Sequence, residues 1–333
     1  MKNQFLQGLI VALFFMTSSI DAQAQINASL MRFPDVSDKN IVFAYANDIW
    51  IVPKTGGEAS RLSSPKGQEV FPKFSPDGQM IAFSGNYDGN NDVFVMPVAG
   101  GIPQRLTSHG YTDRVIDWTA DGNQVIFASS RESGKARYNQ FYKVHKTGGT
   151  IEKLPLEYAE YGSLSPDGSQ MAVVYITQIF RTWKRYKGGT KGKIVIYNFK
   201  DSTSRYLSLP TGGGDEFPMW HANNLYFISD RGSEERMNLY KHDLVTGTTT
   251  QLTNYTDYDI HFPSLGPAEI VYEQGGKLHL YNLAAGTDKS VSVTLVTDET
   301  GLKPKMVSTE NYIQSTALSP DGKRVLIEAR GEI

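Results

Sequence analysis

The tetrapeptide Ser75-Pro76-Asp77-Gly78 recurs along this chain. Two further copies and one diverged copy are Ser165-Pro166-Asp167-Gly168, Ser319-Pro320-Asp321-Gly322 and Thr119-Ala120-Asp121-Gly122. In the three full copies proline sets the φ angle of a β-turn, and in all four copies aspartate can bond to its own backbone and glycine accepts a positive φ. A tight turn that returns between strand-like runs after about 40 to 55 residues indicates one supersecondary unit used repeatedly.

Strand-like apolar runs lie on both sides of each turn, as in Met80 to Phe83 after the first copy. A third run follows, for example Asp48 to Val52, and then a glycine turn and a short fourth run that ends in leucine. Four short strands joined by tight turns are typical of a propeller blade. With diverged copies at Phe217-Pro218-Met219-Trp220 and Phe262-Pro263-Ser264-Leu265, the sequence predicts an all-β fold, a six-bladed β-propeller of four-stranded antiparallel blades.

The ends of the repeat array predict the domain organisation. Residues from about Leu30 to Leu62 supply four strands, so we expect blade one to need no strand from the far end of the array. A seventh copy, in 312–333, is therefore surplus. We expect a propeller over 30–300, a linker over 301–311, and the first hairpin of a second, truncated propeller over 312–333, which makes the chain a fragment of a longer protein.

The first 24 residues resemble a secretory signal. Lys2 precedes an apolar run over 9–16, and the small-residue motif Ala22-Gln23-Ala24 follows it. This order predicts a cleavable signal peptide over 1–24 and export, to a periplasm, with no membrane association after cleavage. The alternative is an uncleaved anchor or a buried helix, although the apolar run is short for a membrane span.

Composition and motifs exclude several functions. The net charge of −2 argues against a general polyanion binder, so no nucleic-acid partner is expected. The chain has no cysteine, and it lacks Gly-x-Ser-x-Gly, His-Glu-x-x-His and P-loop motifs. The six histidines fall in different repeats, and the oxygen-rich segment 88–92 lacks the downstream glutamate of a calcium loop. We therefore assign no catalytic residue, no metal and no cofactor.

One loop departs from the repeat. The hairpin of blade four is lengthened over 180–192 and mixes cations with aromatic residues: Trp183, Lys184, Arg185, Tyr186 and Lys187. Lysine and arginine attract a carboxylate or phosphate, and the aromatic rings offer stacking surface, so these five residues are candidates for a peptide- or anion-binding site. The alternative is a solvated loop whose aromatic residues cover the neighbouring blade.

This loop, placed in the fourth of six blades, resembles a signature of the tricorn proteases, as do Asn47-Asp48-Ile49-Trp50 and the Phe-Pro openings of several blades. The resemblance implies a large self-compartmentalising serine peptidase that degrades oligopeptides, and a chain that is not catalytic alone. The catalytic residues would lie beyond Ile333, in missing C-terminal peptidase domains that would be partners of this region. The full-length form would be a homo-oligomer without a cofactor.

The resemblance also implies a role for the propeller in channelling and gating peptides, with basic residues that receive a peptide carboxylate. The matching candidate is Arg114, although the family's archaeal member has two adjacent basic residues there, and in this chain Asp113 stands beside Arg114. A structural salt bridge is the alternative. The family is usually cytosolic, in contrast to the signal over 1–24. A TolB-like periplasmic propeller that acts as a protein-binding module is the competing function, because the repeat turn is shared with such propellers.

Overall fold

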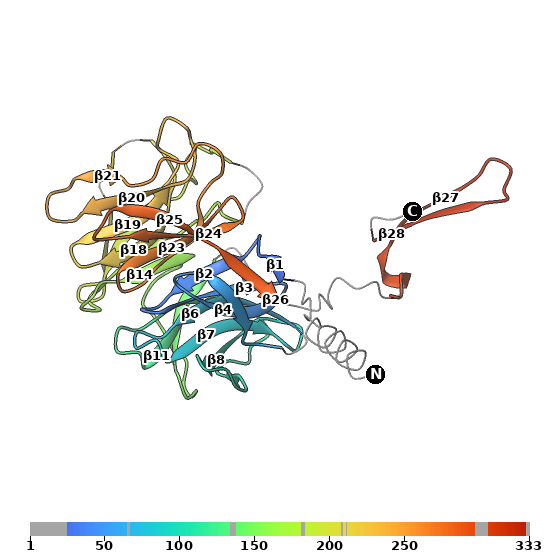
Figure 1. Cartoon of the computed structure of the whole chain (residues 1–333), viewed down its shortest axis with the longest axis horizontal. Helices are drawn as coiled ribbons and strands as arrows, with labels where there is room; N and C mark the ends of the chain where they lie inside the picture. Colours follow the sequence, from blue (N-terminus) through green and yellow to red (C-terminus); the bar gives the residue numbers. More distant parts are fainter. Residues whose placement is uncertain are drawn as a thin grey trace, which may run out of the picture. The chain divides into compact units, whose positions relative to one another are not determined.

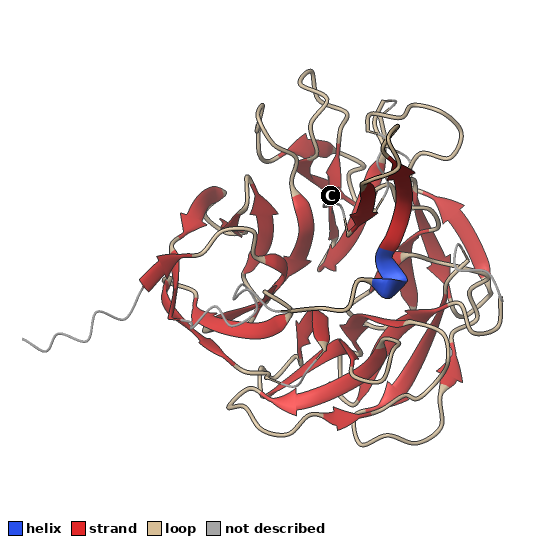
Figure 2. Ribbon diagram, turned by 90° about the vertical axis from the view of Figure 1, so that its right-hand side faces the viewer, coloured by secondary structure: helices blue, strands red, loops and turns tan. Residues whose placement is uncertain are grey.

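The computed structural model describes residues 25–64, 67–133, 138–180, 184–207, 209–210, 212–296 and 306–330. The predicted all-β, six-bladed propeller is confirmed (Figure 1). Within these residues the only helix is the turn Glu310–Tyr312, and strands and loops form the rest (Figure 2). The predicted signal segment 1–24 and Trp183 lie outside the described residues.

Each blade contains four antiparallel strands that follow one another in the chain, and in blade one two further strands extend the sheet. Blades one to three consist of β2 (Arg32–Val36), β3 (Asn40–Tyr45), β4 (Asp48–Pro53), β5 (Gly57–Arg61); β6 (Gln68–Phe74), β7 (Met80–Asn86), β8 (Asp92–Pro97), β9 (Gln104–Arg105); and β10 (Asp113–Trp118), β11 (Gln124–Ser129), β12 (Gln140–His145), β13 (Glu152–Lys153). Blades four to six consist of β14 (Tyr161–Leu164), β15 (Gln170–Val174), β16 (Ile194–Asn198), β17 (Thr203–Tyr206); β18 (Asp215–His221), β19 (Asn224–Ser229), β20 (Asn238–Asp243), β21 (Thr249–Gln251); and β22 (His261–Leu265), β23 (Glu269–Gln274), β24 (Lys277–Asn282), β25 (Thr287–Val291).

The repeated turn is a closed hydrogen-bonded unit. In the first copy Asp77 accepts hydrogen bonds from Ser75 and from the backbone of Gln79, while Ser75 Oγ accepts one from Met80 N at 2.9 Å. Gly78 has a φ of 67°, as the turn requires. The same bonds recur in the later copies, where the donors lower the pKa of Asp121 and of Asp167 to about 2. Because the turn satisfies its own polar groups, it can join inner strands in any blade.

The ring closes through strands from both ends of the array. β26 (Val293–Val296) runs parallel to the outer strand β5, with Val293 opposite Gly57, and β1 (Gln25–Asn27) pairs antiparallel with β26 (Figure 1). The four strands of blade one are local, as expected, but the expectation that this blade needs nothing from the far end is wrong. β5 presents an unpaired edge, and the chain covers it with β26.

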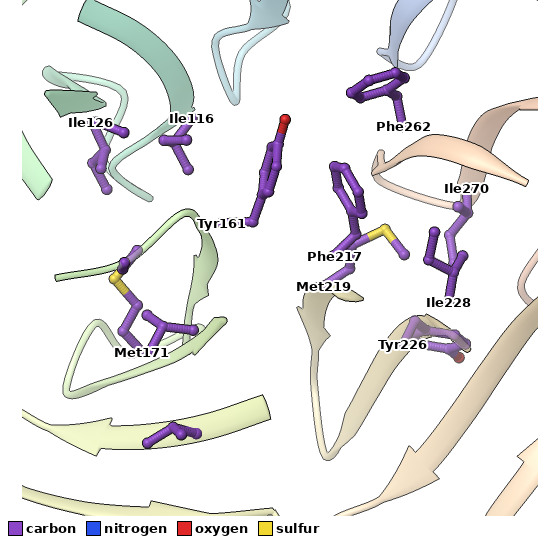
Figure 3. Close-up of a cluster of buried hydrophobic side chains, with 14 of the residues drawn as sticks. Ile116, Ile126, Tyr161, Met171, Phe217, Met219, Tyr226, Ile228, Phe262 and Ile270 are labelled. Atoms are coloured by element: carbon purple, nitrogen blue, oxygen red, sulfur yellow. The ribbon is translucent and has the colours of Figure 1, made fainter. Parts of the chain in front are cut away.

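Apolar side chains fill the spaces between adjacent blades and extend to the centre of the ring. The largest cluster joins blades three to six and includes Ile116, Tyr161, Phe217 and Phe262 (Figure 3). A separate cluster packs blade one against blade six and the closure strand, with Leu295 fully buried. Burial of these side chains is the main force that holds the blades together.

The chain divides into two compact units, 1–296 and 297–333. In the second unit β27 (Ile313–Leu318) and β28 (Val325–Ala329) form a hairpin around the Ser319-Pro320-Asp321-Gly322 turn. The hairpin carries exposed apolar side chains, which include Ile313, Leu318 and Val325. The extra hairpin predicted after the sixth blade is therefore present.

Candidate functional site

Four inner strands carry a phenylalanine in a left-handed conformation directly before a proline. Phe33, Phe71, Phe217 and Phe262 have φ angles of 53°, 55°, 53° and 46°. Each lies where the register of its inner strand shifts, that is, at a β-bulge. A bulky residue at positive φ costs on the order of 1 kcal/mol or more, and such strain collects at functional sites. The repetition of one strained bulge in four blades marks the centre of the ring.

With two further rings, these phenylalanines build an aromatic layer where the inner strands of the blades converge. Ring centroids lie 4.1 Å apart for Phe33 and Phe71, 4.5 Å for Phe33 and Phe262, and 5.6 Å for Phe217 and Phe262. Figure 3 shows Tyr161, Phe217 and Phe262 projecting from separate blades into one space. We define the aromatic layer as Phe33, Phe71, Tyr161, Phe180, Phe217 and Phe262.

A cavity of about 750 Å³ lies against this layer. Inner strands of all six blades line it, together with several of the repeated turns. Its volume falls within the range of small-molecule binding sites, and its wall combines aromatic residues and prolines with a comparable number of polar and charged residues. Its polar residues away from the turns are Asp35, Lys73, Asp117, Ser163 and Ser264.

Asp35 connects three blades beside the cavity. Its carboxylate accepts a hydrogen bond from the backbone of Phe74 at 2.7 Å and another from Ser264 Oγ, and it lies 3.5 Å from Lys73 Nζ. Lys73 also donates to Ser264. Asp35 is almost fully buried, so these partners replace the water that its charge has lost.

Asp117 faces the same cavity from β10 in a different environment. One carboxylate oxygen accepts a hydrogen bond from the backbone of Trp118 at 2.8 Å. Burial raises the pKa of Asp117 to about 6, and nearby Lys73 only partly offsets this effect. The negative charge of Asp35 acts in the same direction as burial. Asp117 is thus the carboxylate in this cavity that could change charge near neutral pH.

Arg114, the candidate for carboxylate binding, contacts the aromatic layer. Its guanidinium carbon lies 4.6 Å from the ring centre of Tyr161 and 5.4 Å from that of Phe180. Its Nη2 atom lies 2.9 Å from the Glu160 carboxylate and also donates to the Glu160 carbonyl oxygen. The salt bridge named as the alternative is therefore present, and the Nε atom of Arg114 is buried without a partner.

Two further buried carboxylates lie beside the aromatic layer. Arg32 forms a 3.0 Å ion pair with Glu273, which also accepts a hydrogen bond from Phe33 N, and burial raises the pKa of Glu273 to about 7. Glu216 accepts hydrogen bonds from Thr177 and from the backbone of Gln178, the latter at 2.7 Å. Charged side chains from several blades thus lie beside the aromatic layer.

The cations of the blade-four loop lie against blades five and six. Lys184 is 3.3 Å from Asp259, and Lys187 is 3.4 Å from Asp230 and 3.8 Å from Glu235. Arg185 has a φ of 55° and lines, with Lys184, a small cavity of about 30 Å³. Tyr186 lies beside Gly188, within the same loop.

The loop also reaches the aromatic layer through Phe180, whose ring lies 5.8 Å from that of Phe262. The guanidinium group of Arg114 also contacts the ring of Phe180. Lys184 and Lys187, in contrast, form ion pairs with carboxylates of other blades. The structure therefore brings Arg114 and the start of the loop together and does not add Lys184 or Lys187 to the same cluster. Anion binding by Arg114 and by the loop stays a prediction.

We expect Arg114→Met to lower the free energy of unfolding by about 2 kcal/mol, because Glu160 would stay largely buried without its cation and keep only the hydrogen bonds from Asn139. Lys184→Met is the matched control: its ion pair is half exposed, so we expect a change within about 0.5 kcal/mol. Urea unfolding followed by tryptophan fluorescence measures both. Equal effects of the two substitutions would show that the Arg114 ion pair is not structural.

Most of the residues that line the cavity could not be identified from sequence patterns. Asp35, Lys73 and Asp117 are ordinary strand residues in the sequence, and the Phe-Pro pairs mark blade openings without revealing that their rings meet. Among the described residues, no cluster of three or more potential metal-binding His, Cys, Asp or Glu residues was found. No helix in the described part of the chain is long and apolar enough to cross a membrane.

Fold and site define a β-propeller whose centre is crossed by aromatic residues next to a polar cavity. Residues 28–287 match the family model described as the tricorn protease N-terminal beta propeller domain. The chain belongs to this family, as its sequence resemblance indicated.

Three relatives illustrate the similarity. The chain is 28% identical over 307 residues to a tricorn protease homolog of Saccharolobus solfataricus, a match that covers 90% of this chain and 28% of that protein. It is 27% identical over 172 residues to a putative tricorn-like protease N-terminal subunit of Sulfurisphaera tokodaii, covering 51% of this chain and 87% of that subunit. The crystal structure of the tricorn protease superposes with a TM-score of 0.71 at 22% identity, over 87% of this chain and 28% of the other.

Proposed function

We propose that this chain is the N-terminal propeller region of a tricorn-like serine peptidase and that it channels and gates oligopeptides. The observation that carries the proposal is the aromatic layer, which crosses the centre of the ring beside a 750 Å³ cavity lined by all six blades. Small shifts of these rings would change the width of the passage, because they contact one another and are held at strained bulges.

The catalytic groups are proposed to come from peptidase domains outside this chain, which spans 28% of the length of its Saccharolobus relative. In Sulfurisphaera tokodaii, relatives of this chain are named as separate N-terminal and C-terminal subunits, the latter 28% identical over 130 residues, covering 39% of this chain and 14% of that subunit. The full-length form is proposed to be a homo-oligomer. Export through a signal peptide over 1–24 is also proposed, and N-terminal sequencing of the mature protein tests it.

The native assembly tests the peptidase role. The genomic copy would be tagged, and the assembly that carries this chain would be purified from its source and assayed with oligopeptides and a fluorophosphonate probe. We expect hydrolysis that the probe abolishes. Stoichiometric recovery of one envelope protein without any hydrolase would instead favour a TolB-like binding module.

The aromatic layer provides the test of gating. In the same assembly, Phe71→Ala with Phe262→Ala removes two touching rings, and we expect the hydrolysis rate of long peptides to change several-fold, with a smaller change for dipeptide reporters. Tyr206→Ala, on an exposed strand of blade four, is the control. A length dependence identical to that of the unmodified assembly would contradict gating by these rings.

A further inference from the structure

Asp117 is a carboxylate without a cationic partner inside the cavity. Among the described residues, its hydrogen bond comes from the backbone of Trp118. Lys73, whose charge lowers the pKa of Asp117, is already bound to Asp35 and Ser264. For the second carboxylate oxygen of Asp117 no hydrogen bond is found within the described residues, and Asp117 lines the cavity.

The cavity as a whole carries a negative charge, like Asp117 itself. Four carboxylates line the cavity and its mouth, against two lysine ammonium groups. The rest of the wall includes eight aromatic residues and seven prolines, among them Phe71, Phe262 and Trp220. A carboxylate beside aromatic faces is complementary to a cation that carries apolar groups, because both attract positive charge in a partly desolvated site.

We propose that this cavity binds short apolar peptides by their protonated amino terminus, with Asp117 accepting the ammonium group and the aromatic layer contacting the side chains. The inference rests on the proposed channelling of peptides. It adds the orientation of the bound peptide, whose amino end would lie in the cavity. A primary ammonium group could also come from a lysine side chain, and the test separates these two sources.

Ionisation of Asp117 gives the site a dependence on pH. The groups that act on this carboxyl are Lys73, Asp35 and the backbone of Trp118, and burial among them raises its pKa to about 6. A protonated carboxyl does not attract an ammonium ion, so affinity should fall below pH 6. At pH 5 we expect binding about tenfold weaker than at pH 7.5, since one pH unit below the pKa leaves roughly a tenth of the group ionised.

Calorimetric titration of the full chain tests the proposal with three peptide amides: Ala-Phe-Leu-Phe, its N-acetylated form, and N-acetyl-Ala-Phe-Leu-Lys. We expect the free amine to bind and acetylation to weaken binding about tenfold, which corresponds to about 1.4 kcal/mol. Asp117→Asn should weaken the free amine by the same factor and abolish its difference from the acetylated peptide. Asp201→Asn, an exposed carboxylate on blade four, is the charge-matched control and should change nothing.

Several results would overturn the inference. These are equal binding of the free and acetylated peptides, a difference that survives Asp117→Asn, and the absence of binding by any peptide. Dependence on Asp117 for the lysine peptide alone would overturn the amino-terminal assignment, and Asp117-dependent binding of Ca²⁺ without peptide binding would replace it with a metal site. Because the titration needs no peptidase, an inactive native assembly and a chain that fails to bind amines are distinguishable outcomes.

Discussion

Asp35→Ala is expected to lower the free energy of unfolding of the chain by about 4 kcal/mol. The substitution leaves the buried backbone N–H of Phe74 without an acceptor, and it removes the partner of Lys73. An unsatisfied buried donor costs about 1–3 kcal/mol. Breaking a fully buried ion pair costs about 3–5 kcal/mol, and the cost is smaller here because Lys73 is partly exposed and keeps its hydrogen bond to Ser264. The effect should be large because Asp35 joins blade one to blades two and six.

Urea unfolding followed by tryptophan fluorescence measures this loss, and two variants calibrate it. Asp35→Asn keeps an acceptor for Phe74 N but not the charge, so we expect a loss of about 2 kcal/mol. Asp38→Ala removes an exposed carboxylate three residues away and should change stability by less than about 0.5 kcal/mol. If Asp35→Ala unfolded at the same urea concentration as Asp38→Ala, Asp35 would not join the blades as described.

The fold could be predicted because its signals are local. Turns such as Ser75-Pro76-Asp77-Gly78 satisfy their own polar groups, and the strands on either side pair with their neighbours in the chain. The closure of the ring could not be predicted in this way. β1 and β26 are short, and they pair with strands more than 200 residues away in the chain, so no turn chemistry reveals them.

The candidate site was predicted only in part, for a related reason. Arg114 and the blade-four loop were chosen for their chemistry, but their partners Glu160, Asp259 and Asp230 come from other segments of the chain. A charge in the sequence does not reveal whether another charge already satisfies it. The cavity was missed because residues such as Asp117 acquire their role only when six inner strands converge.

The backbone strain of the four phenylalanines depends on the closure of the propeller ring. Four phenylalanines at positive φ would relax if the blades could separate, since a bulge with this conformation is costly in an isolated strand. The contacts between the rings compensate for that cost only while the ring is closed. The strand that closes it, β26, should therefore affect the aromatic layer although the two are not adjacent in sequence.

Gly56→Ala is expected to open this closure and to lower the free energy of unfolding by about 3 kcal/mol. Gly56 has a φ of 84°, and a Cβ atom there would lie 2.4 Å from the carbonyl oxygen of Ser292, which precedes β26. That oxygen accepts the hydrogen bond of Gly57 N at 2.9 Å, so the clash would break the pairing of β26 with β5. The positive φ alone accounts for about 1 kcal/mol of the loss.

Gly148→Ala separates the two contributions. Gly148 occupies the same turn in blade three with a φ of 87°, but a Cβ atom there meets nothing within 4 Å. It should therefore cost only the backbone strain, about 1 kcal/mol. Urea unfolding gives the difference between the two variants, and amide hydrogen exchange should show faster exchange at Gly57 and at the β1–β26 pairs in Gly56→Ala alone. Equal losses of stability with unchanged exchange would mean that β26 does not hold the ring closed, and that contacts between adjacent blades are sufficient.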